Sequence, residues 1–291
     1  MKNTLLFIIV SLIWGSTWLV IKFQLGVVDP LLSIFYRFIL AAAIIFVFSF
    51  LRRLNLKFSL KQHFYMALLG ALLFGLNYWF VYLAELHLTS GVVAVVFSTI
   101  IIFNILFGAL FLKSKIRWNV VFSAMLGFIG IALVFWDELL GFTFSSANSV
   151  AFMFALLGAL SASLGNITSA YNQKNDLPVI QANAFGMLYG ALIMLTLAFI
   201  TGKPLTFDFS VSYVASLLYL AVFGSVVGFG SYLTLLGNIG ADKAAYVTLV
   251  LPIIALLLST IFEDYQWTAL AMIGVVLITL GNILILRRKR V

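Results

Sequence analysis

Tyr232–Glu263, YLTLLGNIGADKAAYVTLVLPIIALLLSTIFE, has the same residue pattern as an earlier segment of the chain, and this repeat indicates the fold. The earlier stretch is Tyr82–Lys113, YLAELHLTSGVVAVVFSTIIIFNILFGALFLK, and its residue numbers are lower by 150 throughout. Both begin with Tyr-Leu, and Thr248 of the later stretch falls on Ser98 of the earlier one. Each has the pattern of the end of one apolar helix, a short turn and a second apolar helix. A long-period repeat in a hydrophobic chain is typical of a transporter built from two homologous halves.

The composition requires a lipid environment. The 291 residues are 64% hydrophobic and 9% charged, with a mean hydropathy of +1.18, whereas soluble domains carry about 25% charged residues. Such a chain cannot cover itself with a water-compatible surface. The sequence has no cysteine, which excludes disulfides and thiolate metal sites, and two histidines, His63 and His87, are too few for a multi-histidine centre. We expect no cofactor and no metal.

Apolar runs long enough to cross a bilayer recur along the whole chain. Because they are long and continuously apolar rather than alternating, they predict helices and not the strands of a barrel. The first half is expected to have spans at Thr4–Phe23, Leu31–Leu51, Phe64–Leu86, Gly91–Leu112 and Trp118–Trp136. The second half is expected to have them at Asn148–Tyr171, Val179–Thr201, Ser210–Leu236, Lys243–Phe262 and Trp267–Leu286. The fold class is therefore an all-α integral membrane protein with ten transmembrane helices.

The loop charges predict the orientation. Cytoplasmic loops of membrane proteins carry an excess of lysine and arginine. If both termini lie in the cytoplasm, most basic residues fall in cytoplasmic segments: Lys2, Arg52, Arg53, Lys57, Lys61, Lys113, Lys115, Arg117, Lys174, Lys243, Arg287, Arg288, Lys289 and Arg290. The net charge of +8 is thus a signal of topology, and we expect no nucleic-acid partner. Five spans per repeat is an odd number, so the two halves, residues 1–140 and 141–291, are expected to be inverted.

Polar and aromatic side chains share one face of the third expected span. Tyr78, Tyr82 and Glu85 follow helical spacing, and the matching face of the eighth span carries Ser225, Gly228 and Tyr232. Tyrosine hydroxyls at membrane depth need partners, which an internal pocket supplies. The alternative is that Tyr82 and Glu85 belong to the interfacial belt, where tyrosine is common.

Two further spans offer candidate side chains for the interior. Trp14 and Thr17 are three residues apart in the first span, and Ser163 and Asn166 form a polar stripe in the sixth. Asn166 is too polar to face lipid. Whether it contacts a substrate or only a neighbouring helix stays open.

Arg37 is the one basic residue well inside a span, about 9 Å from its outer end at 1.5 Å per residue. A buried arginine is costly in a membrane. It could attract anionic groups, extend to the interface, or pair with Glu85 or a helix-end carbonyl, and the structural pair is the favoured interpretation. Arg37 and Glu85 are therefore assigned to structure or gating.

Pro252 is the one proline near the middle of a span. It has no N–H to offer the carbonyl of Thr248, four residues earlier, so we expect both residues to face protein or a wet cavity. A tolerated kink with no role in binding is the alternative.

Glycines at helical spacing indicate tight helix packing. The pairs are Gly127 and Gly130, Gly186 and Gly190, and Gly224 and Gly228.

Signatures of hydrolases, transferases and nucleotide sites are missing from the sequence, so an enzyme is not expected. His63, beside a basic loop, is the only candidate that a lipid-modifying enzyme would offer. A passive channel is a further rival.

The sequence resembles the EamA-like drug/metabolite transporters. The resemblance rests on Trp14-Gly15-Ser16, Arg37, Ala84–Gly91 and Ala244–Glu263 with Pro252, followed by Gly274 and Gly281. It implies a secondary carrier with a cavity between helices 1, 3, 4, 6, 8 and 9, and with helices 5 and 10 more peripheral. The sequence departs from the family pattern at Ile102 and Lys113, where the family often has a proline and usually has an acid.

The expected function is therefore that of a multi-pass carrier in a bacterial inner membrane, exporting a small amphipathic metabolite by alternating access. The resemblance favours an amino acid, aromatic or otherwise apolar, or a related compound as the substrate, and an exporter of drugs or other cationic compounds is the alternative. The expected binding residues are Trp14, Thr17, Tyr78, Tyr82, Ser98, Ser163, Asn166, Tyr232 and Thr248. The lipid bilayer is the expected surrounding. The oligomeric state is not determined by the sequence, and a monomer is compatible with it.

Overall fold

The computed structural model describes residues 2–88, 90–116, 118–141, 146–262 and 267–286. Within these ranges the chain forms helices joined by turns and short loops, and none of the described residues lies in a strand. Among the described residues, six helices are long and apolar enough to cross a membrane: Pro30–Leu51, Leu60–Glu85, Val95–Leu112, Ala147–Lys174, Val179–Ile200 and Val211–Ile239. Shorter apolar helices cover Lys2–Thr17, Trp118–Val134 and Ala269–Gly281. The protein is thus an all-helical membrane protein.

Each expected span coincides with a helix or with helical pieces in series. The first half contains α1 (Lys2–Ile21), the 3₁₀ turn η1 (Lys22–Gln24), α2 (Pro30–Leu51), α3 (Leu60–Leu69), η2 (Gly70–Leu76), α4 (Asn77–Glu85), α5 (Ser90–Phe97), α6 (Ile100–Leu112), α7 (Trp118–Val134) and α8 (Trp136–Leu140). The segments α3, η2 and α4 together form the third span, and α5 and α6 form the fourth.

The second half repeats this order. It contains α9 (Ser146–Lys174), α10 (Val179–Ile200), α11 (Val211–Tyr219), η3 (Leu220–Val227), α12 (Gly228–Ile239), α13 (Ala241–Ala244), α14 (Val247–Phe262) and α15 (Ala269–Leu286). The segments α11, η3 and α12 form one continuous span, as α3, η2 and α4 do in the first half.

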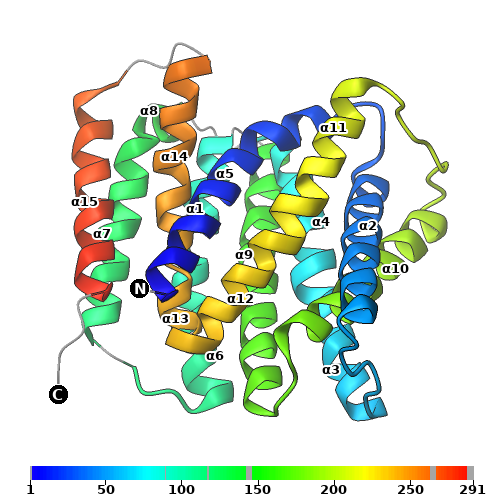
Figure 1. Cartoon of the computed structure of the whole chain (residues 1–291). Coiled ribbons are helices and arrows are strands. Elements are labelled where there is room, and N and C mark those ends of the chain that lie inside the picture. Colours follow the sequence, from blue (N-terminus) through cyan, green and yellow to red (C-terminus); the bar gives the residue numbers. More distant parts are fainter. Residues whose placement is uncertain (1, 89, 117, 142–145, 263–266, 287–291) are drawn as a thin grey trace.

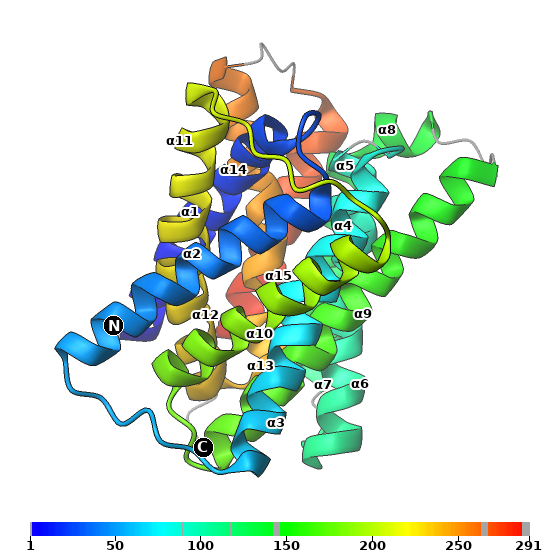
Figure 2. The ribbon, with the colours of Figure 1, turned by 90° about the vertical axis from the view of Figure 1, so that its right-hand side faces the viewer.

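The packing of the helices follows the internal repeat. The first helix of each half packs against the other half: α1 contacts α12 and α14 of the second half, and α9 contacts their counterparts α4 and α6 of the first. Likewise α2 contacts η3, while α10 contacts η2. Two further large contacts each join a helix to its counterpart in the other half: α2 packs against α10, and α7 packs against α15. These two pairs lie at opposite edges of the bundle (Figure 1). Figure 2, in which α2 and α10 face the viewer, shows α9 running through most of the height of the molecule. The arrangement is consistent with a duplicated unit.

Glycine contacts bring two pairs of helical segments close together, α7 with α15 and η2 with α10. A Cβ on Gly130 of α7 would lie 2.7 Å from the carbonyl oxygen of Gly274 in α15, and a Cβ on Gly274 would lie 2.5 Å from the carbonyl oxygen of Gly130. A Cβ on Gly70 of η2 would likewise overlap the carbonyl oxygen of Gly186 in α10 and would lie 2.9 Å from the backbone nitrogen of Gly190. The prediction that glycine pairs mark tight packing is therefore confirmed at these helices.

The outer faces of the helices are apolar and uncovered. Leu110 is 68% exposed, Met125 is 60% exposed and Phe50 is 78% exposed. A water-soluble protein would bury side chains of this size, whereas lipid tails solvate them.

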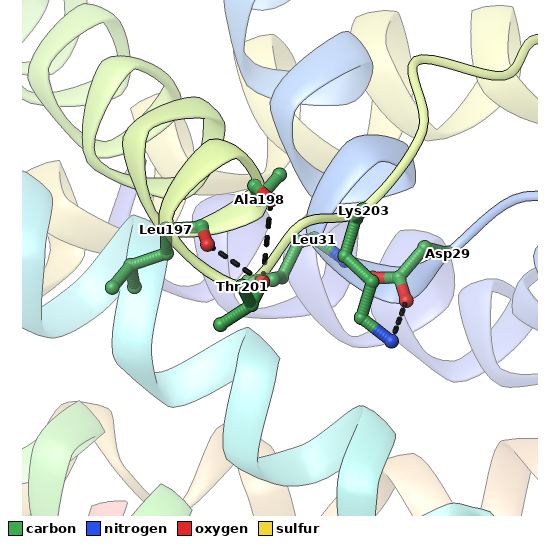
Figure 3. A network of polar contacts seen from close by, with 6 residues as sticks. All are labelled: Asp29, Leu31, Leu197, Ala198, Thr201 and Lys203. Carbon is green, nitrogen blue, oxygen red and sulfur yellow. Dashed lines mark hydrogen bonds and ion pairs between the residues drawn. The ribbon is translucent and has the colours of Figure 1, made fainter.

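An ion pair connects the loops at one end of the bundle. The Nζ of Lys203, after α10, lies 3.0 Å from Oδ2 of Asp29, and Oδ1 of Asp29 accepts a hydrogen bond from the backbone N–H of Leu31 at 3.0 Å (Figure 3). Asp29 is the N-cap of α2 and Pro30 is its first residue, a common helix start. In the same view the hydroxyl of Thr201 donates to the carbonyls of Leu197 and Ala198.

Candidate functional site in the middle of the bundle

Two helices change their winding at corresponding points. The segments η2 and η3 are π-helical and begin at Gly70 and Leu220, the same 150-residue offset as the sequence repeat. A π-helical turn inside an α-helix leaves a backbone carbonyl without its usual partner, and such turns are frequent at functional sites. The partners of these carbonyls identify the side chains around the interruption.

In the first half, a side chain of the same helix replaces the missing partner. The N–H of Asn77 bonds to the carbonyl of Leu72, five residues earlier, and so passes over the carbonyl of Leu73. The side-chain Nδ2 of Asn77 donates to that carbonyl at 3.3 Å. Ser161 of α9 donates its hydroxyl to the Leu72 carbonyl at 2.8 Å.

In the second half, the partner comes from the other half of the protein. The N–H of Gly228 bonds to the carbonyls of Phe223 and Ser225 and passes over that of Gly224. The indole Nε1 of Trp14 in α1 donates to the Gly224 carbonyl at 3.0 Å. Gly228 allows this approach, because a Cβ there would lie 2.5 Å from the indole nitrogen.

Arg37 lies beside the same interruption and is 2% exposed. Its Nε donates to the hydroxyl of Ser225 at 2.9 Å, and its Nη2 donates to the hydroxyl of Tyr78 at 3.3 Å. The guanidinium carbon lies 4.7 Å from the centre of the Tyr78 ring and 5.3 Å from that of Phe38, within the range of cation–π attraction. Nη1 is buried and has no hydrogen-bond partner among the described residues.

The depth of Arg37 does not fit the alternative in which it extends to the interface, and the interpretation that the sequence favours is a structural pair. Ser225, its nearest hydrogen-bond partner, is the middle residue of the span Val211–Ile239. The guanidinium is therefore near the middle of the bundle. In the described part of the chain its partners are neutral hydroxyls, and no ion pair joins Arg37 to Glu85, which is the last residue of α4 and half-buried.

A cluster of aromatic rings fills the space around these groups. Trp14 lies 4.8 Å from the ring centres of both Phe229 and Tyr232. Phe229 also contacts Phe74, at 4.9 Å, and Tyr78, at 6.3 Å. We call this set the central aromatic cluster; its members are Trp14, Phe38, Phe74, Tyr78, Phe229 and Tyr232. It draws on α1, α2, η2, α4 and α12, hence on both halves.

An amide from α9 reaches the same cluster. Nδ2 of Asn166 donates to the hydroxyl of Tyr232 at 3.0 Å, and Oδ1 of Asn166 is buried without a partner among the described residues. One turn earlier on α9, the hydroxyl of Ser163 donates to Oδ1 of Asn104 at 2.7 Å. Nδ2 of Asn104 in turn donates to the carbonyl of Ala241 at 3.2 Å. The polar stripe of the sixth span thus faces the interior.

The hydroxyls of Ser98 and Thr248 occupy equivalent places. Ser98 donates to the carbonyl of Val95 and Thr248 to that of Ala245, both at 2.6 Å. Both bonds lie next to a break in a helix, between α5 and α6 in the first half and between α13 and α14 in the second. Paired breaks at corresponding positions are a feature of transporter binding sites.

The structure brings some of the predicted residues together and leaves others apart. Thr17 is buried, and its methyl group would lie 3.2 Å from a Cβ on Gly224, so it packs at the same interruption as Trp14. Tyr82 is buried in the core at 1% exposure. Pro252 belongs to α14, and its side chain lies outside the described part of the structure.

Sequence reasoning missed several residues of this site. Phe38, Phe74 and Phe229 looked like ordinary apolar residues, and Asn104 was not singled out. An amide in the otherwise apolar span Ile100–Leu112 was a usable signal for Asn104. No pattern distinguished the three phenylalanines from the other phenylalanines of the chain, which has 29.

A cavity of about 330 Å³ is lined by residues from the C-terminal parts of α6 and α9. Its lining includes Asn104, Lys115, Lys174, Asn238 and Asp242. It has more basic than acidic side chains, and through Asn104 it adjoins the polar contacts of Ser163.

His63, the residue that a lipid-modifying enzyme would use, packs against aromatic side chains of α10. Its Nδ1 lies 2.8 Å from the hydroxyl of Tyr189, and its ring meets that of Phe185 edge-on at 4.8 Å. Among the residues described, no group of three or more histidine, aspartate or glutamate side chains is placed to hold a metal ion.

The family comparison matches nearly the whole chain. The model described as the EamA-like transporter family matches residues 1–136 and again residues 149–287.

Curated relatives of similar length also match. "Uncharacterized inner membrane transporter YedA" of Escherichia coli (strain K12) is 31% identical, covering 94% of this chain and 89% of that protein. "Uncharacterized transporter YoaV" of Bacillus subtilis (strain 168) is 26% identical over 94% and 92%, and "Protein PagO" of Salmonella typhimurium is 24% identical over 97% and 92%.

A solved crystal structure shares the architecture. It superposes with a TM-score of 0.80 at 17% identity and covers 97% of this chain and 95% of that chain. At this identity the likeness shows the fold alone.

Proposed function

The chain belongs to the EamA-like transporter family, and we propose that it carries a small amphipathic metabolite, most simply an amino acid, by alternating access. It is a secondary transporter and not an enzyme, since the family consists of transporters. Its place is the bacterial inner membrane, as for its relative in Escherichia coli.

The proposal includes ten spans in two inverted halves, residues 1–140 and 141–291, with both termini in the cytoplasm. The exchanged contacts support it, since α1 contacts α12 and α14 where α9 contacts α4 and α6. The loop charges support the orientation, because basic residues are retained on the cytoplasmic side.

The observation that carries the substrate proposal is the central aromatic cluster with Asn166 at its edge. Rings from both halves meet at the interrupted helices, and a buried amide oxygen there has no partner among the described residues. Aromatic faces hold apolar side chains and cationic groups, while amides and hydroxyls hold polar ends. A zwitterion with an apolar side chain fits such a lining, which includes Trp14, Thr17, Tyr78, Tyr82, Ser98, Ser163, Asn166, Tyr232 and Thr248.

Export is the proposed direction. The 330 Å³ cavity lies at the end of the bundle that the proposed orientation places in the cytoplasm. A cavity open to that side is suited to loading from the cytoplasm.

The test is counterflow in liposomes that contain the purified protein. Liposomes preloaded with an unlabelled amino acid should accumulate the labelled form transiently, and the rate should saturate with concentration. No exchange for any amino acid in a full panel would reject the substrate class. A flux that rises linearly without saturation would indicate a channel instead.

Export of organic cations is the second candidate, favoured by the cation–π capacity of the cluster. Tetraphenylphosphonium distinguishes the two: a cation exporter exchanges it, whereas the amino-acid proposal predicts no counterflow of this probe.

A further inference from the structure

Arg37 is a buried cation whose protein partners are all neutral among the described residues. Its two hydrogen-bond acceptors are the hydroxyls of Ser225 and Tyr78, and Nη1 has none. Burying a charge without a counter-ion is strongly unfavourable, and leaving an N–H without an acceptor adds to the cost. An arginine that served only to hold helices together would be expected to face a carboxylate or a set of carbonyls.

The surroundings of Arg37 are built to hold it in one orientation. Ser225 accepts from Nε while its own hydroxyl donates to the carbonyl of Leu220 at 3.0 Å, so its position is determined from both sides. Gly224 provides the room, because a Cβ there would lie 3.0 Å from Nη2. Two of the three nitrogens are thus engaged, and the third is left for a ligand.

We propose that Arg37 binds the carboxylate of the transported molecule. This assignment rests on the proposed function and adds the group that the site recognises. A guanidinium forms short, charge-assisted hydrogen bonds to carboxylates, and a bound carboxylate would supply both the missing acceptor and the missing counter-charge. In a membrane protein a buried ionisable group of this kind is expected to mark the substrate path.

The neighbourhood matches the rest of such a molecule. The guanidinium stacks over Tyr78, and Tyr78 and Phe38 lie 5.1 Å apart within the central aromatic cluster. An apolar side chain attached to the carboxylate would therefore meet aromatic rings directly. The substrate class becomes a carboxylic acid with an apolar portion, an amino acid among them, rather than an amine or a quaternary cation.

The charge of the cavity is consistent with this assignment. Of the residues that the structure describes, Lys115 and Lys174 line it together with one acid, Asp242, so this lining carries an excess of positive charge. A cavity of one sign concentrates ligands of the opposite sign and raises their rate of entry.

The experiment compares an acid with its amide in the reconstituted transporter. The probes are the amino acid that gives the largest counterflow in the panel and its primary amide, which keeps the side chain and the ammonium group but lacks the carboxylate. For the wild type we expect the counterflow rate of the amide to be lower than that of the acid by a factor of about ten or more. Equal exchange of acid and amide by the wild type would overturn the assignment while leaving the transporter proposal intact.

The variant Arg37→Gln gives the second arm. Its loss should be selective: counterflow of the acid falls about tenfold or more, and the slow exchange of the amide stays within twofold. A matched loss for both probes would mean that Arg37 acts only on the structure, and would reject the assignment. Arg37→Lys, which keeps the charge but not the planar fork, should retain part of the preference for the acid.

Two controls separate binding from folding. Ser225→Ala removes the acceptor that orients Nε and leaves the charge, so it should raise the half-saturating concentration of the acid and still prefer acid over amide. If Arg37→Gln does not fold, the wild-type comparison of acid and amide still decides. If no amino acid exchanges at all, the proposed function itself fails, which is a different result from a carrier that ignores the carboxylate.

Discussion

The indole nitrogen of Trp14 lies 3.0 Å from the carbonyl oxygen of Gly224 and donates a hydrogen bond to it. This contact joins the first helix of one half to the π-helical segment of the other. The carbonyl is available because the N–H of Gly228 passes over it. The change of winding and the tryptophan thus depend on each other.

Trp14→Phe should destabilise the protein and slow transport. Phenylalanine keeps an aromatic ring against Phe229 and Tyr232 but leaves the Gly224 carbonyl without its donor, which costs about 1–3 kcal/mol when the group is buried. The measurement is the thermal unfolding midpoint in detergent, together with counterflow in liposomes.

Trp267→Phe is the matched control. Trp267 also donates its indole N–H, to the hydroxyl of Thr260 at 3.0 Å, but that bond is exposed. Water replaces a lost partner there, so stability should change by less than about 0.5 kcal/mol. Equal effects of the two variants would show that the Gly224 carbonyl does not require Trp14.

The hydrogen bond between Asn166 and Tyr232 should be energetically coupled. Removing the phenol in Tyr232→Phe leaves Nδ2 of Asn166 unpaired, in addition to Oδ1, which already lacks a partner among the described residues. Asn166→Leu removes both amide atoms. A double-mutant cycle on unfolding should therefore give an interaction energy of about 0.5–3 kcal/mol, and additive effects would contradict the contact.

The positions of the helices could be predicted from hydropathy, because each apolar run must satisfy its own backbone in lipid. The second span, expected at Leu31–Leu51, is α2 at Pro30–Leu51. The partners of the site could not be predicted in this way. Trp14 meets Gly224 across 210 residues, and Arg37 meets Ser225 across 188. Those contacts depend on which carbonyl a π turn releases, and no local pattern specifies that.

Gly274→Ala should separate α7 from α15. The added methyl group would lie 2.5 Å from the Gly130 carbonyl oxygen, and backbone atoms cannot move aside as a flexible side chain can. Overpacking of this kind costs about 1–3 kcal/mol. The unfolding midpoint should fall, whereas the ratio of acid to amide exchange should not change, since these helices are remote from Arg37.

Gly230→Ala in α12 is the control for that variant. No atom lies within 4 Å of a Cβ built on Gly230, so the substitution removes only backbone freedom and should leave stability unchanged or raise it by about 0.4–1 kcal/mol. A loss of stability as large as that of Gly274→Ala would mean that the α7–α15 contact is not the cause.

The two residues of the Asp29–Lys203 ion pair should differ in importance, although they share one contact. Lys203 is 45% exposed, so Lys203→Gln loses a screened surface pair worth about 0.2–1 kcal/mol, and that loss should shrink at high salt. Asp29→Ala loses the pair and also the cap on the Leu31 N–H, which adds about 1 kcal/mol that salt does not remove. Unfolding midpoints at low and high salt separate the two terms. Equal losses for both variants at high salt would show that Asp29 does not cap α2, whereas a loss for Asp29→Ala alone would assign its role to the start of the helix rather than to the pair.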